Sequence, residues 1–142
     1  MIGEMAIKPV VTIAPDASVQ EAARLMRAKK VGALVVVNAR KPVGILTDRD
    51  ITVDVVAAGN DPAATAVSTV MHRGPRVVRE DQGLLDAVKI FSSTGVRRLP
   101  VVNRAGALKG IIALDDVLML LGEEMGHVST ALSRSLGRRS AA

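Results

Sequence analysis

Two kinds of hydrophobic pattern alternate along the chain, and each kind occurs in both halves. Continuous aliphatic runs, typical of buried strands, occupy residues 31–37 and 99–102. Apolar residues at helical spacing follow Ser18, where Ser18-Val19-Gln20-Glu21 has the form of a capping box. In the first half the patterns predict strands over residues 10–13, 31–37 and 43–46, and helices after Ser18 and over residues 48–58. In the second half they predict strands over residues 76–79, 99–102 and 108–112, and helices over residues 84–93 and from Asp115.

The two halves also match residue by residue, so the chain contains an internal repeat. Three blocks align: residues 19–23 with 84–88, residues 34–38 with 99–103, and residues 44–51 with 110–117. The offset is 65 for the first two blocks and 66 for the third, because one residue is inserted. Such repeats are single supersecondary units that pack against their own copy, and each half alone would bury little apolar surface. The predicted fold is therefore α/β, with two pseudo-symmetric β-α-β-β-α repeats packed as one compact module.

The domain boundaries follow from the repeat and from the turn residues between its copies. The first repeat is expected over residues 5–60 and the second over residues 76–122. Residues 61–75 form a linker that contains a short helical stretch between proline-containing turns. Residues 123–142 form a C-terminal helix extension that ends in a basic tail.

The last predicted helix continues beyond the second repeat and carries an apolar stripe. The members of the stripe are spaced three and four residues apart, as at the a and d positions of a coiled coil: Leu118, Leu121, Met125, Val128 and Leu132. Charged side chains fall on the other faces of this helix. Two interpretations stay open: the stripe packs on the module of its own chain, or it forms a contact between two copies.

Composition limits the classes of partner. The chain has 142 residues, a net charge of +5 and an isoelectric point near 10.2, which favours anionic partners such as nucleotides. Phe91 is its single aromatic residue, so the stacking platforms of single-strand nucleic-acid binders are missing. The absence of cysteine excludes disulfides and thiolate metal sites. No apolar run reaches the length of a membrane span, and the N-terminus lacks the pattern of a secretory signal, so a cytoplasmic protein is expected.

Candidate chemistry is concentrated where the predicted strand over residues 43–46 meets the following helix. Thr47 and Asp50 stand three residues apart and can face the same side of the first helical turn. A helix N-terminus attracts phosphate, and an ionised carboxylate accepts hydrogen bonds from both hydroxyls of a ribose. The same residues also fit an ordinary helix cap, in which Thr47 or Asp48 accepts a backbone hydrogen bond and Asp50 complements the helix dipole.

Three features occur together in this chain: the tandem repeat, the segment Gly44-Ile45-Leu46-Thr47-Asp48-Arg49-Asp50 that closes the first copy, and the strand start Arg97-Arg98-Leu99-Pro100-Val101. In this combination the chain resembles a pair of cystathionine-β-synthase-type (CBS) domains, the arrangement called a Bateman module, as a stand-alone protein. The resemblance covers residues 5–122. It implies two clefts between the repeats, each able to take an adenosine-containing ligand such as AMP, ADP, ATP or S-adenosylmethionine, and no other cofactor.

For the first cleft the resemblance implies Thr47 and Asp50 on the ribose, with Arg97 and Arg98 at the phosphates. The base would lie against the aliphatic side chains of Ile45, Val77 and Leu99. The planar fork of an arginine matches phosphate oxygens, and an aliphatic slot takes the place of the missing aromatic rings.

The second cleft departs from this pattern. Asp116 keeps the carboxylate, but Ala113 replaces the threonine, and Gly32 and Ala33 replace the two arginines. On the same resemblance, a ligand in this cleft would be held by Asp116, Thr12 and an apolar slot around Ile13 and Ala33. The first cleft is therefore expected to be the working site.

Three functions remain in view. The resemblance favours a regulatory module that senses an adenosine-containing ligand and passes a change of shape to an unknown effector protein. The alternatives are a structural or oligomerisation module with vestigial clefts, and a nucleic-acid-binding module, which the net charge alone supports. Neither an enzyme nor a metal site is expected, because no base–nucleophile constellation appears and His72 and His127 lack companion ligands. The resemblance also implies a homodimer that uses the second helix of each repeat, around Ile51, Val55, Val117 and Leu121.

Overall fold

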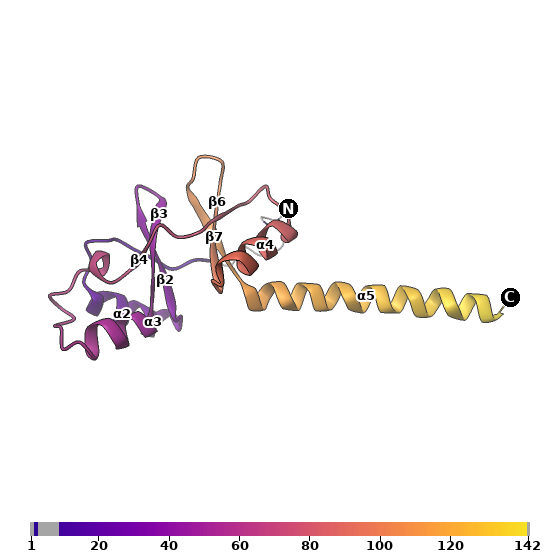
Figure 1. Cartoon of the computed structure of the whole chain (residues 1–142), viewed down its shortest axis with the longest axis horizontal. Helices are drawn as coiled ribbons and strands as arrows, with labels where there is room; N and C mark the ends of the chain where they lie inside the picture. Colours follow the sequence, from indigo (N-terminus) through magenta and orange to yellow (C-terminus); the bar gives the residue numbers. More distant parts are fainter. Residues whose placement is uncertain (1, 3–8, 142) are drawn as a thin grey trace.

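The computed structural model describes Ile2 and residues 9–141, so residues 5–8 of the first predicted repeat lie outside the described part. The first half contains β1 (Thr12–Ile13), α2 (Val19–Lys29), β2 (Ala33–Asn38), β3 (Lys41–Thr47), α3 (Asp48–Asp50) and the π-helical turn η1 (Ile51–Val56). The 3₁₀ turn η2 (Val67–Thr69) and β4 (His72–Arg73) follow. The second half contains β5 (Val78–Arg79), α4 (Leu84–Thr94), β6 (Arg98–Val102), β7 (Leu108–Ala113) and α5 (Leu114–Ala141), as Figure 1 shows.

The described strands form two sheets, one in each half, and confirm the predicted α/β class. The first sheet has the order β1-β2-β3-β4 and the second has the order β5-β6-β7. In both sheets the first strand runs parallel to the second, and the second runs antiparallel to the third. Both hairpins carry the same irregularity, a register shift between Val36 and Val37 in β2 and between Val101 and Val102 in β6. The two repeats therefore share one backbone plan.

Each half is bonded to a residue that precedes the other half's repeat. The backbone N–H of Val67 donates to the carbonyl of Ala17 at 2.8 Å, and that of Ile2 donates to the carbonyl of Gln82 at 2.9 Å. The two bonds are equivalent in the repeat: Ile2 lies 65 positions before Val67, and Gln82 lies 65 positions after Ala17. Part of the region expected to link the repeats therefore belongs structurally to the first half, where β4 also extends the sheet.

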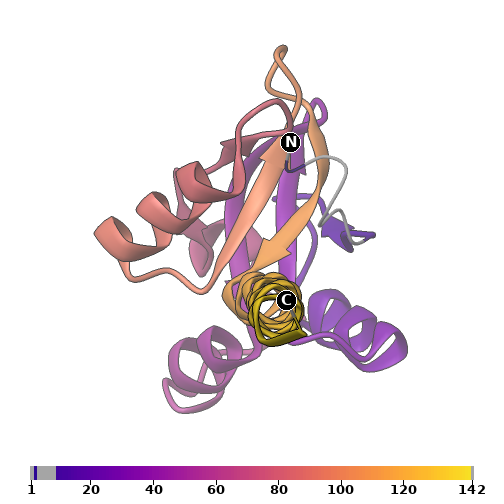
Figure 2. The ribbon, with the colours of Figure 1, turned by 90° about the vertical axis from the view of Figure 1, so that its right-hand side faces the viewer.

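Two hydrophobic cores follow this division. The first core contains Ala22, Met26, Leu34, Val36 and Leu46 together with Val67 and Met71. The second core contains Val78, Ala87, Phe91, Leu99, Val101, Ile112 and Val117 together with Ile2. Viewed along α5, α4 flanks one side of the β6–β7 hairpin (Figure 2). Gly44 allows a close approach in the first core, because a Cβ at this position would collide with the side chain of Met71.

The ends of the first helix in each repeat show one confirmed prediction and one difference. The capping box at Ser18 is present: its Oγ accepts from the backbone N–H of Glu21 at 3.0 Å, and the Glu21 carboxylate accepts from the backbone N–H of Ser18 at 3.3 Å. At the other end, α4 stops at Gly95 with φ +71°, whereas α2 stops at Lys30 with φ +55°. The left-handed conformation suits glycine and costs other residues about 1–2 kcal/mol. Lys30 therefore holds a strained backbone where the second repeat uses glycine.

The helix expected over residues 48–58 is present but is wound more loosely than an α-helix. After α3 the backbone hydrogen bonds reach five residues back, from Ala57 N–H to Thr52 at 2.9 Å and from Asn60 N–H to Val55 at 3.0 Å. Gly59, with φ +73°, ends this segment where the sequence predicts. Val55 is fully buried. Its side chain therefore serves the interior of the module.

The last helix, α5, projects far beyond the rest of the molecule (Figure 1). It has 28 residues, and only its start is anchored, where Val117 is 1% exposed and lies in the second core. The predicted stripe is exposed along the helix, from Leu121 at 37% to Met125 at 65%. The interpretation that the stripe packs on its own module is therefore wrong in this structure. Within the described residues, no helix combines the length and apolar character that crossing a membrane requires.

Candidate functional site

A cavity of about 310 Å³ opens between the two halves, at the level where β7 ends and α5 begins. Its walls come from both repeats. The first half contributes residues before β1, the segment that connects α2 to β2 and the first residue of β2: Pro9, Val10, Val11, Lys30, Val31, Gly32 and Ala33. The second half contributes residues of β6, β7 and α5: Arg98, Ile111, Ala113 and Asp116. The volume lies at the lower end of the range for small-molecule sites, roughly 300–1,000 Å³.

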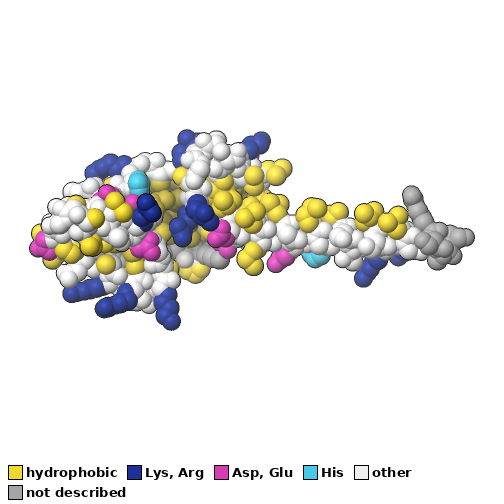
Figure 3. Space-filling model, turned by 60° about the horizontal axis from the view of Figure 1, so that its bottom comes forward, with side chains coloured by type: hydrophobic (Ala, Val, Ile, Leu, Met, Phe, Trp, Pro, Cys, Tyr) yellow, Lys and Arg dark blue, Asp and Glu magenta, His cyan; other side chains and the backbone are white. Residues whose placement is uncertain are grey.

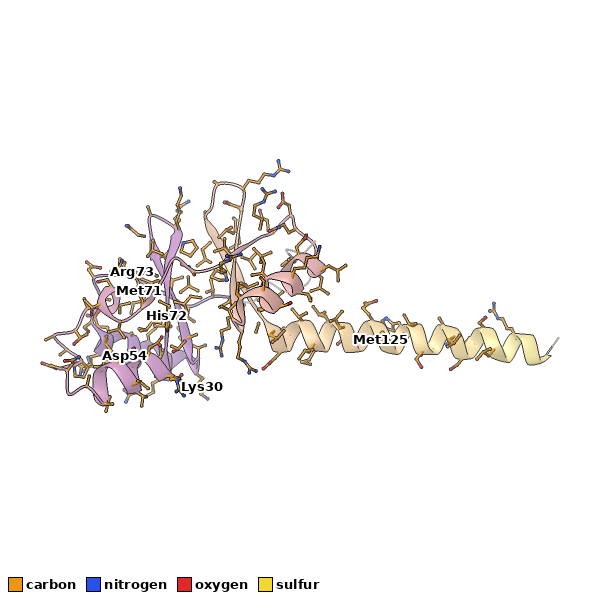
Figure 4. The ribbon with its side chains drawn as sticks, viewed as in Figure 1. Lys30, Asp54, Met71, His72, Arg73 and Met125 are labelled. Atoms are coloured by element: carbon orange, nitrogen blue, oxygen red, sulfur yellow. The ribbon has the colours of Figure 1, made fainter. Side chains whose placement is uncertain are left out.

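Charged side chains of both signs meet at this cavity. Asp116 lies in the first turn of α5, and Arg98 begins β6 directly opposite Ala113 of β7. Lys30 reaches the cavity from the end of α2, where Figure 4 labels it. The N-terminus of α5 adds a partial positive charge from backbone N–H groups. The arrangement offers one carboxylate and two cations around an aliphatic slot, which suits a ligand with hydroxyl groups and a phosphate.

The structure brings together some of the residues expected in the second cleft and separates others. Asp116 and Ala33 line the cavity. Thr12 instead lines a different hollow, of about 380 Å³, beside Arg40. Ile13 packs against the core of the first half. The sequence does not indicate these two cations at the second cleft, because Lys30 precedes the aligned strand start and the resemblance assigns Arg98 to the other cleft.

In the first cleft Thr47 and Asp50 form a reciprocal helix cap. The Thr47 Oγ1 accepts from the backbone N–H of Asp50 at 3.2 Å, and the Asp50 Oδ2 accepts from the backbone N–H of Thr47 at 2.8 Å. The Asp50 Oδ1 lies 2.8 Å from His72 Nε2. Both oxygens of this carboxylate therefore have protein partners. Asp50 is 8% exposed and is the one buried charged residue in the described part of the chain.

The sequence does not indicate the contact between His72 and Asp50, because the two residues are 22 positions apart. His72 belongs to β4, which pairs with β3 so that His72 stands opposite Ile45 (Figure 4). Its side chain is 73% exposed. The contact arises because β4, a short strand from the segment between the repeats, pairs with β3. No local sequence pattern indicates this pairing.

The other residues expected in the first cleft differ in their burial. Ile45 and Val77 are half-buried, whereas Leu99 has no exposed surface and packs in the second core. Successive residues of a strand face opposite sides, so Arg98 points outward where Leu99 points into the core. The exposed Arg97 Nη2 donates to Asp115 Oδ1 at 3.3 Å.

A separate charged cluster lies before α4, outside both clefts. The guanidinium of Arg79 donates to both carboxylate oxygens of Asp81, at 2.6 and 2.9 Å, and Arg104 donates to the same carboxylate at 3.3 Å. The hydrogen bonds and charge of Arg79 hold the pKa of Asp81 below its ordinary value, and Asp81 raises the pKa of Arg79 in turn. Among the residues that the structure describes, no group of three or more histidine, cysteine or acidic side chains is placed to hold a metal ion.

Comparison with known proteins identifies the repeat. The CBS domain family model matches residues 2–56 and 67–123, once for each half. The CBS domain-containing protein YhcV of Bacillus subtilis is 37% identical over 126 residues, which cover 87% of this chain and 89% of the relative. An uncharacterized protein of Methanopyrus kandleri is 36% identical over 120 residues, 84% of this chain. The match spans only 61% of the length of that relative.

Solved structures show the same fold. The crystal structure of CBSX2 in complex with AMP superposes with a TM-score of 0.73 at 27% sequence identity. The superposition covers 87% of this chain and 97% of CBSX2. Both expectations drawn from the sequence, the tandem repeat and its fold, are confirmed by these comparisons.

Proposed function

Because the chain belongs to the CBS domain family, we propose that it is a regulatory module that binds an adenosine-containing ligand between its two repeats. The observation that carries the proposal is the cavity of about 310 Å³ to which both halves contribute. Similarity to CBSX2, whose structure contains AMP, supports the choice of an adenosine ligand. The proposed role is regulatory rather than catalytic.

Asp116 is the proposed ribose ligand in this cavity. It stands in the first turn of α5, at the position equivalent to Asp50 of the first repeat. A carboxylate can accept hydrogen bonds from two neighbouring hydroxyls. The slot beside it is formed by aliphatic residues such as Val11, Val31 and Ile111. These residues supply apolar contact to a flat base in a chain with a single aromatic side chain.

Lys30 and Arg98 are the proposed phosphate ligands. Lys30 occupies the left-handed position at which the second repeat has Gly95. Strained backbone conformations persist where the surroundings over-determine them, and they cluster at functional sites. Lys30 lines the cavity, and a proposed role in phosphate binding is a physical reason to keep a lysine there. Two cations favour a short phosphate chain, as in AMP or ADP, over uncharged adenosine.

The first cleft is the competing site. Sequence and resemblance favour it, because it has both the threonine and the aspartate. In the structure, however, the two carboxylate oxygens of Asp50 are engaged by Thr47 and His72. A ribose would have to displace the imidazole before it could use this carboxylate. The second cleft is the proposed primary site because the cavity of about 310 Å³ lies there, with residues of both repeats in its walls.

The mechanism of regulation follows from where the ligand contacts the chain. Lys30 belongs to the first half, whereas Arg98 and Asp116 belong to the second half. A ligand that contacts all three favours the relative orientation of the halves in which the contacts are made together. The size of the response is limited by the difference in affinity between the two orientations. An effector protein that contacts both halves would read this difference.

Titration calorimetry with adenosine, AMP, ADP, ATP and S-adenosylmethionine tests the proposal. Asp116→Asn removes a charged acceptor, and hydrogen bonds to charged groups contribute about 1.5–3 kcal/mol, so AMP affinity should fall roughly ten- to hundredfold. Asp50→Asn, which keeps a capping oxygen, is the matched control and should leave AMP affinity within about twofold. The reverse result would place the working site in the first cleft. If no adenosine compound binds the parent protein, the proposal fails and the oligomerisation alternative gains.

A further inference from the structure

The projecting part of α5 displays a continuous apolar face to solvent (Figure 3). Its large side chains are 60% exposed at Leu118, 65% at Met125, 59% at Val128, 59% at Leu132 and 54% at Leu136. Glu123, Glu124, His127 and Arg134 lie on other faces of the same helix. A helix with one apolar stripe normally turns that stripe toward another element.

This segment is a poor candidate for a helix that stands alone in water. Isolated helices gain little from propensity, and most helical stability comes from packing of an apolar face. The exposed segment also contains Gly122, Gly126 and Gly137, each about 1 kcal/mol less favourable than alanine. Without a partner, α5 would therefore lose helical structure beyond its anchored start.

We propose that α5 pairs with α5 of a second copy of this chain, parallel and in register. The spacing of the stripe is that of a and d positions, which are self-complementary when two identical helices meet at a two-fold axis. Leu118, Met125 and Leu132 then occupy a positions, and Leu121 and Val128 occupy d positions. The stripe buries roughly 1,000–1,200 Å² in such a pair, near the lower end for specific protein–protein contacts.

The number of apolar layers favours the parallel orientation. Antiparallel pairing keeps four layers of the stripe: it sets either Leu118 against Val128 of the second copy, or Leu121 against Leu132 with Leu118 against Ser135. The first of these two registers also brings the two Glu124 carboxylates together on one flank of the seam, where like charges repel. In the parallel register Glu124 lies beside Ser129 of the second copy, and every layer from Leu118 to Leu132 stays apolar.

This surface is separate from the proposed ligand site. The stripe begins beyond Val117, and the cavity lining reaches only as far as Asp116 along α5. Pairing through α5 is therefore expected with or without an adenosine ligand. An experiment that contradicts pairing through α5 can therefore be distinguished from one that contradicts the ligand proposal.

The absence of cysteine from the parent chain allows a direct test with single-cysteine variants of the full-length protein. In a parallel pair, Val128→Cys places two thiols face to face across the seam, within the distance a disulfide requires. Thr130→Cys, at an f position on the opposite face, is the matched control. Under mild oxidation at the same concentration, Val128→Cys should form a covalent dimer several-fold faster than Thr130→Cys, with AMP present or absent.

Two results would overturn the proposal. Equal cross-linking rates for the two variants would mean that the chains cross-link by random collision and not through paired α5 helices. Cross-linking that appears only when Leu118→Cys and Val128→Cys chains are mixed would mean the antiparallel register.

Circular dichroism is a second measurement, and it reports on pairing of α5 even where the CBS modules also associate through other surfaces. Val128→Glu should reduce helicity by circular dichroism and abolish its rise with protein concentration, whereas Thr130→Glu should preserve both. Concentration-independent helicity in the parent protein would contradict pairing, because a solitary helix does not respond to mass action.

Discussion

Replacing Lys30 by glycine should change stability and ligand affinity in opposite directions. Lys30 ends α2 with φ +55° and ψ +45°, whereas the equivalent helix end in the second repeat is Gly95. The same lysine lines the cavity between the repeats. The substitution therefore relieves backbone strain and removes a cation from the proposed phosphate site.

The two effects have estimable sizes. A left-handed residue other than glycine costs about 1–2 kcal/mol, and the greater chain entropy of glycine offsets about 0.5–1 kcal/mol of the gain. The net increase in the free energy of unfolding should be about 0.5–1 kcal/mol, or about 2–3 °C in Tm. Loss of one exposed cation at a phosphate should cost about 1 kcal/mol, which is roughly a fivefold weaker affinity for AMP.

Lys29→Gly is the matched control, because it removes the same charge one residue earlier. Lys29 is the last residue of α2, is exposed and does not line the cavity. Glycine there should lower stability by about 1 kcal/mol through its weak helix propensity and should leave AMP affinity unchanged. Urea unfolding and titration calorimetry on both variants give the two readouts.

The reasoning is refuted if Lys30→Gly is less stable than the parent protein, because the left-handed strain would then be absent. It is refuted for the ligand site if Lys30→Gly and Lys29→Gly bind AMP equally well. Affinity for adenosine, which has no phosphate, should be the same in all three proteins.

Three further predictions concern the frame of the module. Asp50→Ala should lower the free energy of unfolding by about 1–2 kcal/mol, because it breaks the reciprocal cap with Thr47; urea unfolding that leaves the midpoint unchanged would contradict this. Gly44→Ala should destabilise by about 1–3 kcal/mol, since its Cβ meets Met71 in the core, and thermal unfolding should show a clearly lowered Tm. Asp81 has a pKa below its ordinary value in the folded state, so the stability it contributes is present above about pH 4 and is lost as the pH falls through the folded pKa. Asp81→Asn should therefore lose less stability than the parent between neutral pH and pH 3, as measured by urea unfolding at both values.

The order of the elements was predictable because local patterns determine it. The capping box at Ser18 and the stop at Gly59 lie where the sequence places them. Contacts between distant segments were not predictable in the same way. The packing of Ile2 in the second core and the contact of His72 with Asp50 depend on where residues outside the aligned blocks of the repeat pack. A repeat shows which positions are equivalent, but it does not show which half a connecting segment completes.

The candidate site was predicted in part for the same reason. The aspartate at the start of the second helix is local information, and both copies have it, at Asp50 and Asp116. Cavity walls, in contrast, combine residues from two halves. Lys30 faces the second cleft only because the end of α2 lies near the start of α5. Lys30 precedes the strand starts that align between the two copies, so the repeat does not indicate its place at this cleft.

Two repeats of the same topology with different side chains give a physical basis for the proposed division of roles between the clefts. At the first cleft the carboxylate closes a helix cap with Thr47 and holds His72, so the site is already satisfied by the protein. At the second cleft Ala113 removes the capping hydroxyl, and the strained Lys30 adds a cation. Asp116, in the first turn of α5, lines the cavity between the repeats. Although the second cleft departs from the family pattern in sequence, the structure has a cavity there with walls from both repeats, and under the proposed function this cavity is the place for a ligand.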